Sequence, residues 1–398
     1  MKKAKVDYRV FIGDNSLIDR RTFLLGLSRV MGAGSLALIP ERWLSGGNPL
    51  YAATSGNLLD AEGIPLRKRA AAKGLLFGAA TGYGLLSQQK GFAELFVREC
   101  GILVPESELK WARLRPAPDK YDFAQADWMM EFARENSLLL RGHTLVWHEA
   151  LPKWFPEVVT PKNAEKFLRE HIKTVVGRYV GRMHSWDVVN EPIASWDRRP
   201  DGLRNTPWLK LLGPQYIEIA FHAAAAADPK AMLVLNQNHL EYDTKDDEEI
   251  RSATLRLLEG LKKRGVPIHA LGIESHLTGD ETRFNPAKFR RFLQQVADLD
   301  LKILITELDV EDQKLTADVG MRDKIIAEKY AEFLSAALAE PAVIAVITWG
   351  LSDRSTWLSS YKPREDRQPV RTLPFDKDLR PKPAWHAIAK AIGNASGR

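Results

Sequence analysis

Cysteine is almost absent from this chain, because Cys100 is the only one among 398 residues. A single thiol excludes an intramolecular disulfide framework and a cysteine-rich metal site. Its neighbourhood, VRECGIL, is more typical of a buried structural thiol than of a reactive one. The chain also lacks tandem repeats and low-complexity linkers, and no stretch beyond residue 53 is apolar enough to span a bilayer. One large domain is therefore the simplest interpretation.

Excess charge is also nearly absent once the first 53 residues are set aside. The whole chain has a formal charge of +6, but residues 1–53 hold eight Lys/Arg and four Asp/Glu. The remainder has 49 basic against 47 acidic residues, a net charge of +2. The sequence therefore gives no support to a nucleic-acid partner.

The first 53 residues have the order of an export signal: lysines, an apolar stretch, then small residues. Arg20 and Arg21, followed by Thr-Phe-Leu, resemble the twin-arginine signal that a receptor of the export machinery reads. A retained membrane anchor is the alternative, but Arg29, Ser28 and several glycines interrupt the run, which falls short of the ~20 apolar residues that a span needs. We expect residues 1–53 to be a signal and short linker, and the mature protein to be periplasmic or secreted without a stable membrane anchor.

Eight short apolar runs alternate with amphipathic stretches of helical period over residues 54–398. Such runs are typical of buried strands, and the helical stretches include residues 163–180 and 322–340. This alternation predicts a single (β/α)8 barrel. A doubly wound open sheet is the alternative, but no glycine-rich phosphate loop follows the first run. The predicted strands lie within residues 74–81, 101–109, 138–147, 185–192, 231–238, 270–277, 301–309 and 343–351.

Polar or aromatic side chains follow nearly all of these runs, and a barrel brings the carboxyl ends of its strands to one mouth. Glu191 and Glu307 each end an apolar run, and paired carboxyls are what glycoside hydrolysis requires. Trp147, Trp349 and Trp357 are candidates for stacking against sugar rings. Each residue taken alone also fits a structural role, but the shared position at strand ends favours a common site.

A metal site is a further alternative, because several residues at these ends are of metal-ligand types: His143, His148, Glu191, His276 and Asp309. No HExxH motif and no His-x-His pair occurs, so we expect neither a metal nor another cofactor.

At these residues the sequence strongly resembles glycoside hydrolase family 10, the barrel endo-β-1,4-xylanases. The resemblance covers nearly the whole mature chain. It includes ESELKW (106–111), RGHTLVWH (141–148), WDVVNEP (186–192), YIEIAFHAAAAADP (216–229), ITELDV (305–310) and FDKDLRPKPAW (375–385).

The resemblance implies that Glu191 is the general acid/base and Glu307 the nucleophile of a retaining double displacement. It implies that Asn190 binds the 2-hydroxyl of the sugar being cleaved, and that His276 connects Glu307 to Asp309. The residues implied to surround the substrate are Glu106, Lys110, His143, Trp147, Glu274, Trp349 and Trp357.

The chain also departs from the family pattern. Ser107 stands where family members usually have Asn, and Ala150 and Glu274 stand where they have Gln. An aromatic residue is often found near the position of Asn238. These changes affect recognition of outer sugars and add a carboxyl group to the site.

We therefore expect an exported, monomeric retaining endo-β-1,4-xylanase that acts on xylan or xylo-oligosaccharides. The alternatives are a related retaining β-glycanase with another substrate and a catalytically impaired glycan-binding protein.

Overall fold

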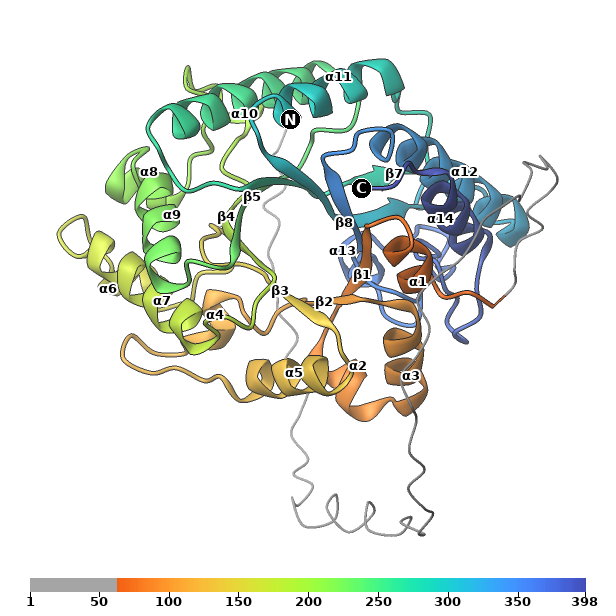
Figure 1. The fold of residues 1–398 in the computed structure, drawn as a ribbon, viewed down its shortest axis with the longest axis horizontal. Coiled ribbons are helices and arrows are strands. Elements are labelled where there is room, and N and C mark those ends of the chain that lie inside the picture. Colours follow the sequence, from red (N-terminus) through yellow and green to blue (C-terminus); the bar gives the residue numbers. More distant parts are fainter. Residues whose placement is uncertain (1–62) are drawn as a thin grey trace, which may run out of the picture. The chain divides into compact units, whose positions relative to one another are not determined.

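The computed structural model describes residues 63–398, so the expected export signal and its linker lie outside the described residues. Eight parallel strands follow one another in the order β1-β2-β3-β4-β5-β6-β8-β9. Pairing of β9 with β1 closes them into a ring, and the helices lie outside it (Figure 1). The predicted (β/α)8 barrel is confirmed, and the open-sheet alternative is wrong because the ring has no free edge.

All eight predicted strands are present, and the structure adds one short strand, β7, which pairs in parallel with the carboxyl end of β8. The strands are β1 (Leu76–Thr81), β2 (Ile102–Pro105), β3 (Leu139–Gly142), β4 (Ser185–Asn190), β5 (Met232–Gln237), β6 (Ala270–Ile273), β7 (His276–Thr278), β8 (Lys302–Glu311) and β9 (Val343–Thr348).

The two helical stretches singled out in the sequence form α7 and α12. Among the described residues, none of the helices is both long and apolar enough to span a bilayer. The helices are α1 (Leu66–Ala71), α2 (Tyr83–Gln88), α3 (Lys90–Glu99), α4 (Trp111–Leu114), α5 (Ala124–Glu135), α6 (Phe155–Val158), α7 (Ala164–Arg178), the 3₁₀-helix η1 (Ser195–Asp197), α8 (Pro207–Leu212), α9 (Tyr216–Ala227), α10 (Lys245–Lys263), α11 (Pro286–Ala297), α12 (Val319–Ala337), α13 (Leu358–Tyr361) and α14 (Pro383–Asn394).

Side chains alternate across the wall of the ring, as the period of two in a strand requires. On β2, Leu103 belongs to the large cluster that includes residues of the helices, whereas Ile102 and Val104 belong to a second, smaller cluster formed mainly by strand residues. Burial on both faces explains why the strands appear in the sequence as continuous apolar runs.

A β-bulge in β8 changes this alternation next to Glu307. The pairing of β8 with β9 shifts register between Ile305 and Leu308, and both of these residues belong to the large cluster that faces the helices. In a regular strand one residue separates two side chains that face the same side, but here Thr306 and Glu307 both lie between Ile305 and Leu308. Bulges commonly redirect a side chain at an active site, and here the bulge leaves both Thr306 and Glu307 able to contact the interior residue Asn236.

Candidate active site

The predicted site residues lie at the carboxyl ends of the strands, and hydrogen bonds link several of them. Asn236 Nδ2 donates to Asn190 Oδ1 and to Glu307 Oε1, in both cases at 2.8 Å. Asn190 Nδ2 lies 3.3 Å from Glu191 Oε1. The side chains of Glu191, directly after β4, and Glu307, on β8, are thus connected through two amides.

Glu307 is buried and surrounded by positive charge. His276 Nε2 lies 3.4 Å from its Oε2, and His143 Nδ1 lies 3.9 Å from its Oε1. Burial by itself raises the pKa of a carboxyl group, but the hydrogen bond from His276 and the charges of His143, His276 and Lys110 lower the pKa of Glu307 to about 2. Glu307 is therefore ionised at neutral pH, as a nucleophilic carboxylate must be.

His276 is held between two acids. Its Nδ1 donates to Asp309 Oδ1 at 2.9 Å, while its Nε2 faces Glu307. Although burial opposes the charged form, Asp309 and Glu307 raise the pKa of His276 well above its usual value. An imidazolium has a proton on both nitrogens, so His276 presents a donor to each of the two acids.

Asp309 also orients an aromatic side chain of the site. Its second oxygen, Oδ2, accepts a hydrogen bond of 2.7 Å from Trp357 Nε1. The fully buried Asp309 therefore fixes His276 and Trp357 relative to each other, and their ring centroids lie 5.0 Å apart.

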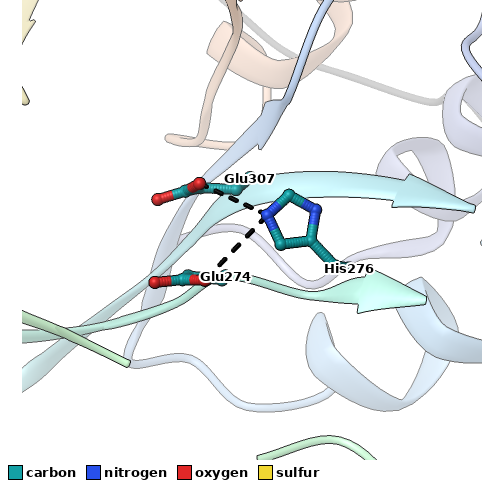
Figure 2. A group of neighbouring side chains, drawn as sticks. All are labelled: Glu274, His276 and Glu307. Carbon is teal, nitrogen blue, oxygen red and sulfur yellow. Dashed lines mark ion pairs between the residues drawn. The ribbon is translucent and has the colours of Figure 1, made fainter. Parts of the chain in front are cut away.

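Glu274 brings a third carboxyl group to the same imidazole. Figure 2 shows His276 pointing one nitrogen toward both Glu307 and Glu274. Glu274 Oε2 lies 3.9 Å from that nitrogen, and the candidate ligand atoms of the three residues lie within 4.8 Å of one another. Burial, together with the negative charges of Glu307 and Glu191, raises the pKa of Glu274 well above its usual value. Glu274 thus keeps its proton to higher pH than an ordinary carboxyl group, whereas the pKa of the neighbouring Glu307 is lowered.

Asn236 is central to the site, although the sequence analysis did not select it. Its amide has two hydrogens, and the two 2.8 Å bonds use both, so the 3.3 Å contact with Glu274 Oε1 is the weakest of the three. Thr306 Oγ1 donates to Asn236 Oδ1 at 2.7 Å, which fixes the orientation of the amide. Its place at the polar end of the fifth apolar run, LNQN, was the signal from which it could have been found.

Glu191 has an unusual backbone, with a φ of 52° in the left-handed region. This conformation is costly for a residue with a Cβ atom. Both main-chain groups of Glu191 are satisfied: its N–H donates to the Asn236 carbonyl at 2.8 Å, and its carbonyl accepts from Arg204 Nε at 2.8 Å. Strand β4 therefore ends at Asn190, one residue before the acid and two before Pro192.

The Glu191 side chain is in a different electrostatic environment from that of Glu307. Burial raises its pKa; the cations Arg204 and His148 oppose that shift, and the anions Glu149 and Glu307 add to it. Arg204 Nη2 lies 3.3 Å from Glu191 Oε2. Burial has the larger effect, so the net pKa of Glu191 is raised while that of Glu307 is lowered. Carboxyl groups with pKa values moved in opposite directions suit one acid and one nucleophile.

His143 is oriented by a buried ion pair within the barrel. Its Nδ1 lies 3.0 Å from Asp187 Oδ2, and the other oxygen of Asp187 accepts from Arg141. All three residues are almost fully buried. Arg141 and Asp187 lie within apolar runs rather than at their ends, so the sequence pattern did not indicate them.

Aromatic rings and polar side chains form another part of the site. Lys110 Nζ lies 4.9 Å from the centroid of the Trp147 ring and 5.7 Å from that of Trp349. Trp349 also meets His143 edge to face, at a centroid distance of 5.1 Å. Glu106, Trp349 and Trp357 line one pocket. The substrate-binding residues named from the sequence are thus brought together, with Lys110 connecting Trp147 to Trp349.

The positions that depart from the family pattern lie close to these residues. The Ala150 carbonyl accepts a 2.9 Å hydrogen bond from Ala112 N, at the start of α4. Ser107 is exposed, and its N–H donates to Glu108 Oε2 at 3.1 Å.

Comparisons with known proteins identify the family to which this chain is similar. The sequence model of glycosyl hydrolase family 10 matches residues 65–391. Endo-1,4-beta-xylanase B of Thermotoga neapolitana is 32% identical over 83% of this chain and 92% of its own length. Two crystal structures superpose with a TM-score of 0.75, and each matches 83% of this chain and 98% of its own. They are native xylanase 10B from Thermotoga maritima, 34% identical, and xylanase 10B from Thermotoga petrophila RKU-1 in complex with xylobiose, 33% identical.

Proposed function

This chain belongs to glycosyl hydrolase family 10, and we propose on that premise that Glu191 is the acid/base and Glu307 the nucleophile of its reaction. The protein is a retaining endo-β-1,4-xylanase. The observation that supports the two roles best is the opposite displacement of two pKa values, with that of Glu307 lowered to about 2 and that of Glu191 raised.

In the first step, Glu307 attacks the anomeric carbon while Glu191 protonates the leaving oxygen. His276 donates to Glu307 and keeps it ionised before the attack. Asn190 is held by Asn236 and retains capacity for a hydrogen bond to the sugar hydroxyl nearest the reacting carbon. In the second step, Glu191 acts as a base toward the water that releases the sugar from Glu307.

Product analysis tests the reaction directly. We expect the purified mature protein to release short oligosaccharides from xylan, and proton NMR to show the β-anomer first. Mixed-linkage glucan and mannan should be cleaved much more slowly. If the α-anomer appears first, both residue roles are wrong, because a glycosyl-enzyme on Glu307 requires two inversions.

We also propose that the precursor is exported by the twin-arginine route and acts as a monomer outside the cytoplasm. The basis is the Arg20-Arg21 pair ahead of an apolar stretch. Replacing both arginines with lysine keeps the charge but should leave the precursor in the cytoplasm. Activity outside the cytoplasm that persists after this change, and disappears when the general secretory route is blocked, would contradict the proposal. Sedimentation of the mature protein tests the oligomeric state.

A further inference from the structure

A tryptophan on the loop that follows Glu191 remains exposed. Trp196 lies in η1 with 47% of its surface accessible, and it is the one tryptophan among the exposed large apolar residues of the described chain. Large apolar side chains that stay exposed beside a site are candidates for ligand contacts.

The loop that presents Trp196 is tied at several points. Ile193 and Leu203 form an antiparallel bridge, and the Arg204 N–H donates to the Pro192 carbonyl at 2.7 Å. Ser195 Oγ donates to Asp246 on α10 at 3.1 Å. Trp196 is therefore held on a constrained hairpin, and a sugar that binds it need not order the loop first.

Arg204 connects Trp196 to the proposed acid. Its guanidinium carbon lies 5.0 Å from the centroid of the Trp196 ring, while its Nη2 lies 3.3 Å from Glu191 Oε2. The indole and the His239 ring also form a T-shaped pair, at a centroid distance of 5.2 Å. One guanidinium thus spans the gap between the indole and the carboxyl group. Arg204 lies over the ring, and 47% of the Trp196 surface remains accessible to a ligand.

The contacts of Glu191 indicate which part of the substrate approaches Trp196. Its Oε1 faces Asn190, which leads through Asn236 to Glu307 and the sugar that is attacked. Its Oε2 faces Arg204 and, beyond it, Trp196. The acid must protonate the leaving oxygen, so the departing sugars lie beside Glu191 on the side away from Glu307.

We infer that Trp196 is a stacking platform for the xylose units that leave with the cleaved bond. The exposed indole face binds a pyranose ring, and Arg204 keeps that face aligned with the acid. This inference rests on the proposed function, because it assigns a substrate segment to the same site. It predicts that Trp196 affects long substrates and acceptor sugars, but affects substrates with a small aryl leaving group far less.

The test compares Trp196→Ala with the wild type on xylohexaose and on 4-nitrophenyl β-xylobioside. Both substrates occupy the attacked side, but the aryl compound has no sugar on the departing side. We expect kcat/KM for xylohexaose to fall roughly tenfold, a factor that corresponds to about 1.4 kcal/mol. The aryl substrate should change by no more than about twofold, the scale of an ordinary surface substitution. Transfer of xylobiosyl groups to added xylobiose should fall along with xylohexaose cleavage.

Two variants serve as controls. Trp196→Tyr keeps an aromatic face and should recover most of the xylohexaose activity, whereas a merely structural role for indole packing would not predict such recovery. Val180→Ala removes a 52% exposed apolar side chain between α7 and β4, before the strand that Glu191 follows. It should leave kcat/KM unchanged for both substrates. An equal loss of kcat/KM on both substrates in Trp196→Ala, or no loss on either, would contradict the proposal that Trp196 binds the departing sugars. A wild type that cleaves neither substrate would overturn the proposed function as well.

Discussion

Arg204 holds Glu191 through both its main chain and its side chain, donating to the carbonyl at 2.8 Å and facing Oε2 at 3.3 Å. The positive charge opposes the rise in the pKa of Glu191 that burial causes. This single residue therefore affects both the unusual backbone of the acid and its protonation.

Replacing Arg204 with glutamine should shift the pH profile of xylan hydrolysis. Without the cation, the pKa of Glu191 rises further, so the acid keeps its proton to higher pH. The alkaline limb of kcat/KM should therefore move to higher pH, although the maximal rate falls because the Glu191 carbonyl loses a partner. Arg204→Lys should keep the alkaline limb closer to that of the wild type. A control on the same loop, Arg198→Gln, removes an exposed charge and should leave the limb unchanged. Movement of the limb to lower pH in Arg204→Gln would show that another group sets it.

The catalytic roles of Glu191 and Glu307 can be distinguished with substrates whose leaving group departs without protonation. Glu307→Ala should lose essentially all turnover, even on activated aryl xylosides, because no glycosyl-enzyme forms. Glu191→Ala should retain the first step on these substrates, since a good leaving group needs no proton. Its second step should slow by roughly 10²- to 10⁴-fold, the scale of general acid/base catalysis. Stopped-flow measurement should show a burst and then slow turnover that azide accelerates. A burst in Glu307→Ala would reverse the assignment.

The sequence was sufficient to predict the barrel because strands buried on both faces form continuous apolar runs. It also located most of the site, since polar residues at the ends of parallel strands meet at one mouth. Arg141 and Asp187 were missed because they pair inside the barrel, within runs that are otherwise apolar. Arg204 was missed because only the folding of the hairpin brings it from 13 positions away back to Glu191.

Local backbone geometry was not predictable from the same patterns. The left-handed φ of Glu191 and the bulge before Leu308 both depend on hydrogen bonds to other strands. The short strand β7 was not separated from β6, because residues 270–277 form one apolar run in the sequence. These backbone features depend on how neighbouring strands align with each other, and the sequence of one strand does not specify that alignment.

Glu274→Gln should change how stability depends on pH. The folded state raises the pKa of Glu274, so between the unfolded and folded pKa values the folded protein binds more protons than the unfolded chain. Wild-type stability therefore falls as pH rises through this window, which begins near the unfolded value of about 4.3. Glutamine cannot ionise, so the melting temperature of Glu274→Gln relative to the wild type should increase with pH. The control Glu259→Gln, at an exposed position on α10, should show no such trend.

The same variant should also change how catalysis depends on pH. Once ionised, Glu274 competes with Glu307 for the positive charge of His276, whose Nε2 faces both. The ratio of kcat/KM for Glu274→Gln to that of the wild type should therefore rise with pH. A ratio that stays constant while the stability trend is present would mean that Glu274 titrates without affecting Glu307.

Gly272 on β6 tests whether Asn236 must keep its position. A Cβ atom at this residue would lie 2.1 Å from Asn236 Oδ1 and 3.0 Å from Thr306 Cγ2, so Gly272→Ala must displace the amide that joins Asn190 to Glu307. Overpacking of this kind costs roughly 1–3 kcal/mol, and kcat should fall even in variant protein that remains folded.

Gly177→Ala is the matched control, because nothing lies within 4 Å of its added Cβ in α7. That change should stabilise the protein by about 0.5–1 kcal/mol through helix propensity. Urea unfolding and xylan assays on both variants provide the comparison. Wild-type activity in a stable Gly272→Ala protein would show that the site tolerates displacement of Asn236, and that Asn190 and Glu307 do not depend on its amide.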